Sequence, residues 1–170
     1  IKEHPEWFSF RPDGTIKYAE NPPKKYQDIV NVDFYCEQSE SLWFELRDTF
    51  LYWANEGVRI FRVDNPHTKS VPFWEWVIRE VQSVYPDTLF LAEAFTKPPM
   101  MKMLAKVGFS QSYTYFTWRE SRYELEKYFK ELTTTEMKEY YRPNLFPTTP
   151  DIMPMYLHGA PRSAFIIRFI

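Results

Sequence analysis

Two short apolar runs, separated by a stretch of helical periodicity, constrain the fold of this chain more than any other feature. The first run covers residues 58–63 and the second covers residues 88–92, and both have the length of buried strands. A helix is expected between them because apolar residues recur there at the spacing of one helix face: Trp74, Val77, Ile78, Val81 and Val84. Strand, helix and strand in this order predict a βαβ unit with two parallel strands.

The same alternation continues on both sides of this unit. We expect further strands and helices at residues 28–34, 41–56, 100–107, 109–116, 120–132, 145–149 and from about 162 onward. This pattern predicts an α/β fold that forms part of a (β/α)₈ TIM barrel, roughly strands 4 to 7 with their helices. Residues 1–28, with a turn at Asp13-Gly14, are expected to form a loop or hairpin insertion, and residues 29–170 the partial barrel. The chain opens without Met and stops inside an apolar run, so we interpret it as an internal fragment.

Composition narrows the classes of function. The net charge is -2, with no long run of one sign, so nothing favours nucleic acid or a membrane as the partner. No apolar run approaches the ~20 residues of a membrane span, and the single cysteine, Cys36, excludes an internal disulfide framework. Aromatic residues reach 19%, which fits either a heavily packed core or the recognition of sugars by flat rings.

Two acidic residues directly follow the two apolar runs. Asp64 ends the first and Glu93 ends the second. The carboxyl ends of parallel strands meet at one edge of a sheet, so both groups can face a single cleft. A pair of carboxyl groups at that spacing suits acetal chemistry, in which one attacks the anomeric carbon and the other protonates the leaving oxygen. A single acid after a strand is also a common helix N-cap, so neither residue is diagnostic alone.

The neighbours of the two acids suggest different roles for them. Arg62 lies two residues before Asp64 on the same strand face, where its charge would keep that carboxylate ionised. Glu93 stands among apolar residues, and desolvation there would suit a general acid. Asp151 follows the third candidate strand and could orient sugar hydroxyls, although Pro-Asp is also frequent in turns.

One loop offers groups for an anion. The segment NPPKKYQD contains Asn21, Lys24 and Tyr26, which together supply amide, ammonium and phenol donors. A merely solvated basic loop is the alternative reading. We expect no metal, because His4 and His158 are scattered and no metal-ligand spacing occurs.

At this point several motifs resemble a known family. The segment FRVDN is similar to the R-x-D motif of the α-amylase superfamily, glycoside hydrolase family 13, and FLAEA is similar to its general-acid motif. More narrowly, ENPPKKYQDI, GVRIFRVDNPHTK, FLAEAFTKP and TPDI resemble the α-1,4-glucan:maltose-1-phosphate maltosyltransferases. The resemblance covers most of the chain. The His-Asp that usually precedes the third acid in the superfamily is Pro150-Asp151 here, which disfavours a plain amylase.

The resemblance implies a role for each candidate residue. Asp64 would be the nucleophile, Glu93 the acid/base and Asp151 a third, transition-state-stabilising carboxylate. Arg62 would support the nucleophile. The donor phosphate would be bound by Asn21, Lys24, Tyr26 and Asn65.

The resemblance also implies a reaction. Maltosyl units would pass, with retention of configuration, from α-maltose 1-phosphate to the non-reducing end of an α-1,4-glucan through a covalent glycosyl-Asp intermediate, with release of phosphate. We expect no cofactor, a cytoplasmic location and a homodimer in the full-length protein. Three alternatives remain open: an α-glucan hydrolase, a trehalose-forming isomerase, or an inactive carbohydrate-binding fragment.

Overall fold

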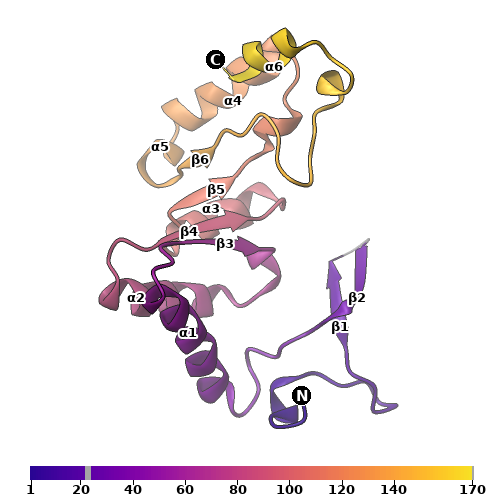
Figure 1. Ribbon diagram of the computed structural model, residues 1–170, viewed down its shortest axis with the longest axis vertical. Helices are drawn as coiled ribbons and strands as arrows, with labels where there is room; N and C mark the ends of the chain where they lie inside the picture. The colour runs from indigo at the N-terminus through magenta and orange to yellow at the C-terminus, as the bar shows by residue number, and fades with distance from the viewer. Residues whose placement is uncertain (22–23, 170) are drawn as a thin grey trace. The chain divides into compact units, whose positions relative to one another are not determined.

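The computed structural model describes residues 1–21 and 24–169, and at positions 21 and 24 it describes the backbone alone. The chain divides into two compact units. Figure 1 labels their helices and strands. The first unit consists of Ile1–Arg59 and Thr68–Thr88, and the second of Ile60–His67 and Leu89–Ile170.

A β-hairpin dominates the start of the first unit. It follows a short 3-10 helix, η1 (Pro5–Trp7), and pairs β1 (Tyr18–Asn21) with β2 (Lys24–Val30) in antiparallel fashion. The expected strand at 28–34 is therefore placed wrongly: the strand starts earlier, and its partner is the neighbouring hairpin strand. The turn expected at Asp13-Gly14 is present, because the Asp13 carboxylate accepts a hydrogen bond of 2.9 Å from the backbone N–H of Thr15.

Two helices form the core of the first unit. They are α1 (Ser39–Asn55) and α2 (Val71–Val84), and α2 begins where the Ser70 hydroxyl accepts a hydrogen bond from the N–H of Phe73. The ring of Trp43 on α1 packs against Phe73 on α2, with 5.4 Å between the ring centres. Both expected helices are confirmed. Their buried faces are narrower than the apolar stripes suggested, since Trp53 is 51% exposed and Val84 is also exposed.

A parallel sheet forms the centre of the second unit, in the order β3-β4-β5-β6. Its strands are β3 (Ile60–Asp64), β4 (Leu89–Glu93), β5 (Gln111–Tyr113) and β6 (Pro143–Asn144). The βαβ prediction is thus confirmed, with α2 as the crossover helix along the chain.

The last two strands are shorter than expected. The predicted strand 109–116 ends at Tyr113 because the Thr114 hydroxyl accepts a hydrogen bond from Phe116 N and starts a 3-10 helix, η3 (Tyr115–Trp118). The predicted strand 145–149 is wrong, since pairing is confined to β6, just before it. Pro147 and Pro150 have no N–H to donate to a strand ladder there.

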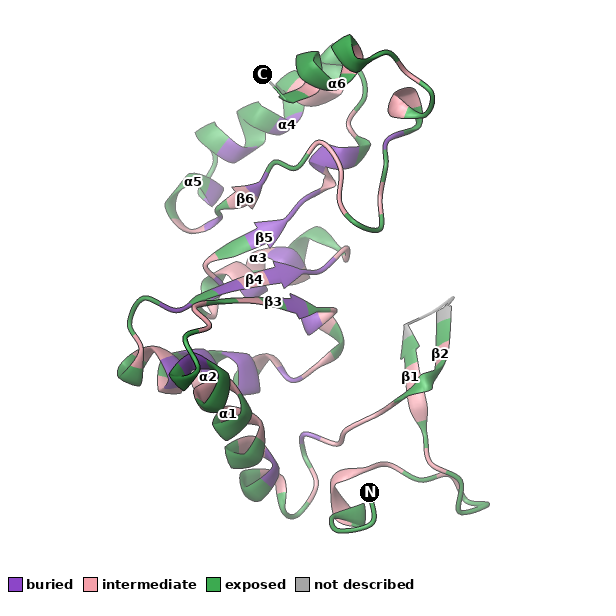
Figure 2. Cartoon of the chain, in the orientation of Figure 1, coloured by how far each residue is buried: buried purple, intermediate pink, exposed green. Residues whose placement is uncertain are grey.

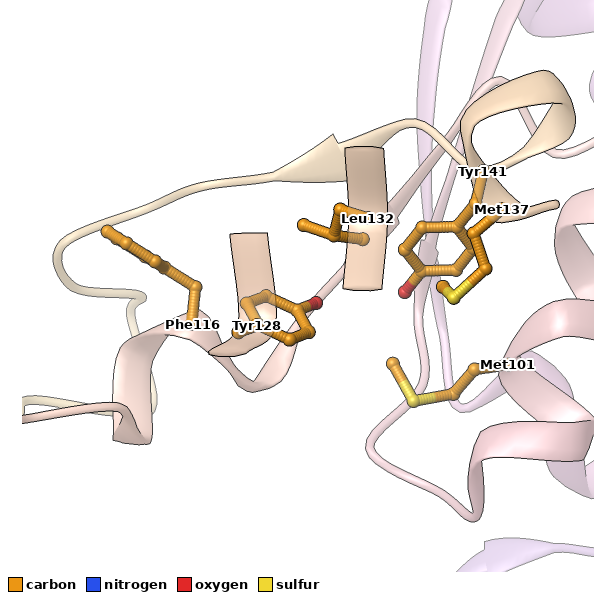
Figure 3. Packing of buried hydrophobic residues seen from close by; sticks show 6 residues of the cluster. All are labelled: Met101, Phe116, Tyr128, Leu132, Met137 and Tyr141. Atoms are coloured by element: carbon orange, nitrogen blue, oxygen red, sulfur yellow. The ribbon is translucent and has the colours of Figure 1, made fainter. Parts of the chain in front are cut away.

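The second unit has four α-helices in its described part, and all but the last of them contribute to an apolar cluster. They are α3 (Pro98–Lys106), α4 (Arg122–Thr134), the short α5 (Met137–Tyr140) and α6 (Arg162–Phe169), with a 3-10 turn, η4 (Met155–Leu157). The helix cluster consists of six buried residues: Met101, Phe116, Tyr128, Leu132, Met137 and Tyr141 (Figure 3).

Burial distinguishes one face of α4 from the rest of the helix. The buried positions Tyr128 and Leu132 face the cluster, whereas most of the remaining helix surface is exposed (Figure 2). The N-terminus of α4 has a reciprocal cap: the Ser121 hydroxyl accepts from Glu124 N, and the Glu124 carboxylate accepts from Ser121 N. Within the described part of the chain, no helix is long and apolar enough to cross a membrane.

Candidate active site

The register of β3 and β4 sets the position of the two principal acids. Asp64 pairs with Glu93 as the last residue of each strand. Paired residues of neighbouring parallel strands project from the same sheet face, and alternate residues along one strand do likewise. Arg62, Asp64 and Glu93 therefore share one face of the sheet, as the sequence predicted, while Val63 is buried on the other.

Asp64 is exposed, and its neighbour Asn65 orients it. The Asn65 side-chain amide donates to Asp64 Oδ1 at 2.7 Å. Asn65 has φ +48°, and among the described residues it is the one non-glycine residue in the left-handed region. That turn also lets the backbone N–H of Asn65 donate to the carbonyl of Glu93 at 3.0 Å. The strained turn thus ties the ends of β3 and β4 together where the acids emerge.

Glu93 is the buried member of the pair, with 8% of its surface exposed. Burial is the main cause that raises the pKa of the Glu93 carboxyl, and its hydrogen bond and like charge with Asp64 raise it further. The positive charge of Arg62 and the N–H of Asn65 act in the opposite direction. The balance leaves Glu93 more easily protonated than an ordinary glutamic acid.

Arg62 links three acidic or phenolic groups. Its Nη2 lies 3.6 Å from Glu93 Oε1 and 3.4 Å from Asp151 Oδ2. Its guanidinium carbon stands 5.6 Å from the centre of the Tyr113 ring. Partial burial of Arg62 opposes its charge, but the hydrogen bond with Tyr113 and the charge of Glu93 outweigh this and raise the pKa of Arg62. Arg62 therefore remains a permanent cation at the site.

Asp151 reaches the site from far along the chain. Its ion pair with Arg62 joins residues 89 positions apart, although no strand precedes it. The Asp151 side chain is largely exposed, which leaves it open to an incoming ligand. The structure therefore brings together Arg62, Asp64, Glu93 and Asp151.

This arrangement can perform acid–base chemistry beside a nucleophile. It combines one exposed carboxylate, one buried carboxyl that is easily protonated, and a fixed cation beside the buried group. Among residues 1–21 and 24–169, no group of three or more His, Cys, Asp or Glu residues is placed to hold a metal ion.

The residues expected to hold phosphate lie mainly in the hairpin of the first unit. Tyr26 is half-buried in β2 and pairs with Ala19 of β1. Asn21 and Lys24 are register partners at the end of the hairpin, and their side chains fall outside the described part of the structure. Asn65 contacts Asp64 directly, as described above.

Sequence reasoning missed Tyr113. The interpretation of 109–116 as one strand placed this tyrosine in the middle, although it is the last residue of β5. It continues the face of Glu93, because β4 and β5 pair Leu91 with Gln111 two residues earlier. The usable signal was Thr114, a good capping residue that ends the strand early.

Known proteins share sequence with this chain over its whole length. No protein-family profile matches the chain. It is 61% identical over 170 residues to the α-1,4-glucan:maltose-1-phosphate maltosyltransferase of Rhodospirillum rubrum, and 62% identical over 168 residues to that of Cereibacter sphaeroides. These matches cover 100% and 99% of the chain but only 25% and 28% of the relatives, so the chain spans about a quarter of their length.

A solved structure is similar in fold. The α-amylase from H. orenii matches with a TM-score of 0.59 at 15% identity, over 85% of this chain and 36% of that one. This likeness concerns the fold alone, and with the parallel sheet it confirms the expected partial (β/α)₈ barrel. By sequence, the chain corresponds along its whole length to a segment of proteins named α-1,4-glucan:maltose-1-phosphate maltosyltransferases.

Proposed function

We propose that the protein containing this chain transfers maltosyl units from α-maltose 1-phosphate to the non-reducing end of α-1,4-glucans, with retention of configuration. The observation that carries the proposal is the in-register pair of Asp64 and Glu93, one exposed and one with a raised pKa, at the ends of adjacent strands. The names of the relatives supply the donor and the acceptor.

In the first step, Asp64 attacks the anomeric carbon of the donor. The bond from that carbon to the phosphate oxygen breaks, and the carboxylate oxygen of Asp64 forms a β-maltosyl ester. Glu93 gives its proton to the departing phosphate. The raised pKa of Glu93 supports this role, because the Glu93 carboxyl is then protonated in a larger fraction of the protein molecules near neutral pH.

In the second step, the 4-hydroxyl of the glucan attacks the ester carbon. Glu93, now ionised, accepts the hydroxyl proton, and the carboxylate of Asp64 leaves. Two displacements at one carbon return it to the α configuration. Transfer in place of hydrolysis requires that the glucan exclude water from the site.

The other polar residues assist these two steps in the proposal. Asp151 binds sugar hydroxyls and stabilises the positive charge that develops on the sugar. Arg62 holds Glu93 and Asp151 in place through its two ion pairs. Asn65, Asn21, Lys24 and Tyr26 bind the donor phosphate, which needs several donors for its oxygens.

The full-length protein enters the proposal as well. We infer that residues 1–28 form an insertion and residues 29–170 part of the barrel, and that the parent protein is a cytoplasmic homodimer. The relatives extend well beyond the segment that this chain matches, and we infer that the remaining barrel strands belong to those parts. The proposed activity therefore belongs to the intact protein, and the isolated 170 residues would lack part of the site.

Two assays on the intact protein test the proposal against its rivals. The first follows phosphate release from α-maltose 1-phosphate with maltoheptaose as the acceptor, together with the growth of the acceptor by two glucose units. The second follows release of reducing sugar from starch and the conversion of maltose to trehalose. Phosphate release coupled to acceptor growth supports the maltosyltransferase. Activity confined to the second assay would identify a hydrolase or an isomerase, and glucan binding without turnover would identify an inactive binding protein.

A further inference from the structure

An aromatic platform lies beside the acids in the second unit. We use this name for the rings of Phe95, Tyr113, Tyr115 and Trp118, which come from the segment after β4, the end of β5 and helix η3. None of these four residues takes part in the two steps described above.

The rings of the platform brace one another. Trp118 packs edge-on against Phe95, with 4.8 Å between ring centres, and lies 5.3 Å from Tyr115. The Tyr115 hydroxyl donates to the carbonyl of Thr96 at 2.9 Å, which fixes that ring to the segment after β4. Such ring pairs add stability beyond the area they bury, so the indole of Trp118 is held in one orientation.

Contacts run without a gap from Arg62 to the platform. The guanidinium of Arg62 faces the ring of Tyr113, which lies 6.3 Å from the ring of Phe95. Phe95 follows Glu93 by only two residues and contacts Trp118. Exposure changes along this path: Tyr113 is 7% exposed, while Trp118 is 43% exposed. The outer end of the platform therefore presents an indole ring to solvent.

The surroundings of Trp118 indicate what kind of ligand fits it. Arg119 and Glu120 follow it directly in the sequence, but the Arg119 guanidinium stands over the Tyr128 ring and the Glu120 carboxylate accepts a hydrogen bond from Met155 N. A pyranose suits an exposed indole that is held in one orientation, because its C–H face packs on a flat ring while its hydroxyls remain hydrated.

We propose that Trp118 stacks on a glucosyl unit of the acceptor glucan and so sets the affinity of the site for α-1,4-glucan. This inference rests on the proposed function. The acceptor is the better occupant than the donor, because a maltosyl phosphate is short and is held through its phosphate. Trp118 lies two ring contacts beyond Tyr113, at the exposed end of the path that starts at Arg62.

The test uses Trp118→Ala and Trp118→Phe in the intact protein, with Trp53→Ala as a matched control at a tryptophan of similar exposure on α1. We expect Trp118→Ala to raise the KM for maltoheptaose about tenfold, which is the loss of one stacked ring. In the same variant, the KM for α-maltose 1-phosphate stays within about twofold of the parent value. Trp118→Phe retains part of the affinity, and Trp53→Ala changes neither constant.

A binding measurement separates this inference from the proposed function. Calorimetric titration of maltoheptaose into the Asp64→Asn protein, with and without Trp118→Ala, requires no turnover. If the parent protein did not use maltose 1-phosphate while glucan binding to the Asp64→Asn protein still depended on Trp118, the proposed function would fail and the role of Trp118 in glucan binding would stand. If Trp118→Ala left glucan binding unchanged, or raised the KM for donor and acceptor equally, while the parent protein transferred normally, only the role of Trp118 would be overturned.

Discussion

Two regions of the second unit differ in the kind of residues that they bring together. The carboxylate rim, defined as Arg62, Asp64, Asn65 and Glu93, collects charge, a left-handed backbone and a carboxyl with a raised pKa. The helix cluster around Leu132 collects buried apolar side chains under a well-capped helix. The rim holds groups in states that cost energy, while the cluster contributes the stability that makes those states tolerable. Substitutions in the two regions should therefore change different properties.

The largest expected effect is on catalysis at the rim. Replacing the proposed nucleophile in Asp64→Ala should reduce kcat of the intact protein by at least about 10⁴-fold. Because Asp64 is exposed, the free energy of unfolding should change by no more than about 0.5 kcal/mol. Transfer assays and thermal melting on one preparation measure both quantities.

The matched control for Asp64→Ala is Asp48→Ala, which removes an exposed carboxylate from α1. This control should retain kcat within about twofold, the equivalent of a few tenths of a kcal/mol. Near-normal transfer by the Asp64 variant would contradict the assignment of the nucleophile.

The second largest effect is expected in the helix cluster, where a substitution should change stability and leave kcat unchanged. Leu132→Ala removes a side chain with 7% exposure and should lower the free energy of unfolding by about 2–5 kcal/mol. The kcat of the protein that remains folded should stay close to the parent value. Chemical denaturation measures the loss, and Lys130→Ala on the exposed face of α4 is the control. A lower kcat at full folding would show that rim and cluster are coupled.

A smaller effect is expected at the start of α4. Ser121→Ala removes the acceptor for Glu124 N and breaks the reciprocal cap, at a cost of about 1 kcal/mol. Ser121→Asp, which keeps an acceptor at the cap, should restore most of the loss. Equal stability of the alanine variant and the parent would mean that α4 is held by the cluster alone.

The most subtle effect is a change in titration at the rim. Asp64→Asn removes the like charge that helps to raise the pKa of Glu93, so this pKa should fall toward the ordinary glutamic acid value. Glu93 would then lose its proton at a lower pH than in the parent protein. Carbon-13 NMR of labelled carboxyl groups records this directly, with Asp48→Asn as the control. If the pKa of Glu93 stayed constant or rose in Asp64→Asn, the charge of Asp64 would not be a cause of the raised pKa.

The sequence was informative where local patterns decide structure. The apolar runs before Asp64 and Glu93, and the helical stripe between them, sufficed to predict the parallel β3–β4 pair. Strand alternation then placed Arg62 on the same face as Asp64. These inferences succeeded because periodicity and the rule for strand ends involve few residues, all close along the chain.

The remaining parts of the site depend on contacts between distant segments. The ion pair of Arg62 with Asp151 spans 89 positions, and the expected strand that was to deliver Asp151 does not form. The sequence did not single out Tyr113 or Trp118, because no local pattern distinguishes a buried ring from an exposed one. Such features follow from tertiary packing, which overrides local preference.

The pairing of Asp64 with Glu93 has a consequence for how this site can change. Its spacing comes from main-chain hydrogen bonds between β3 and β4, and not from the residues that occupy the two positions. Other reactive side chains placed at 64 and 93 would inherit the same separation. A single-residue deletion within β3 would instead slide Asp64 by about 3.3 Å and turn it to the opposite face. The β3–β4 pairing therefore tolerates other side chains at positions 64 and 93, whereas a change in the length of β3 would destroy the alignment of the two positions.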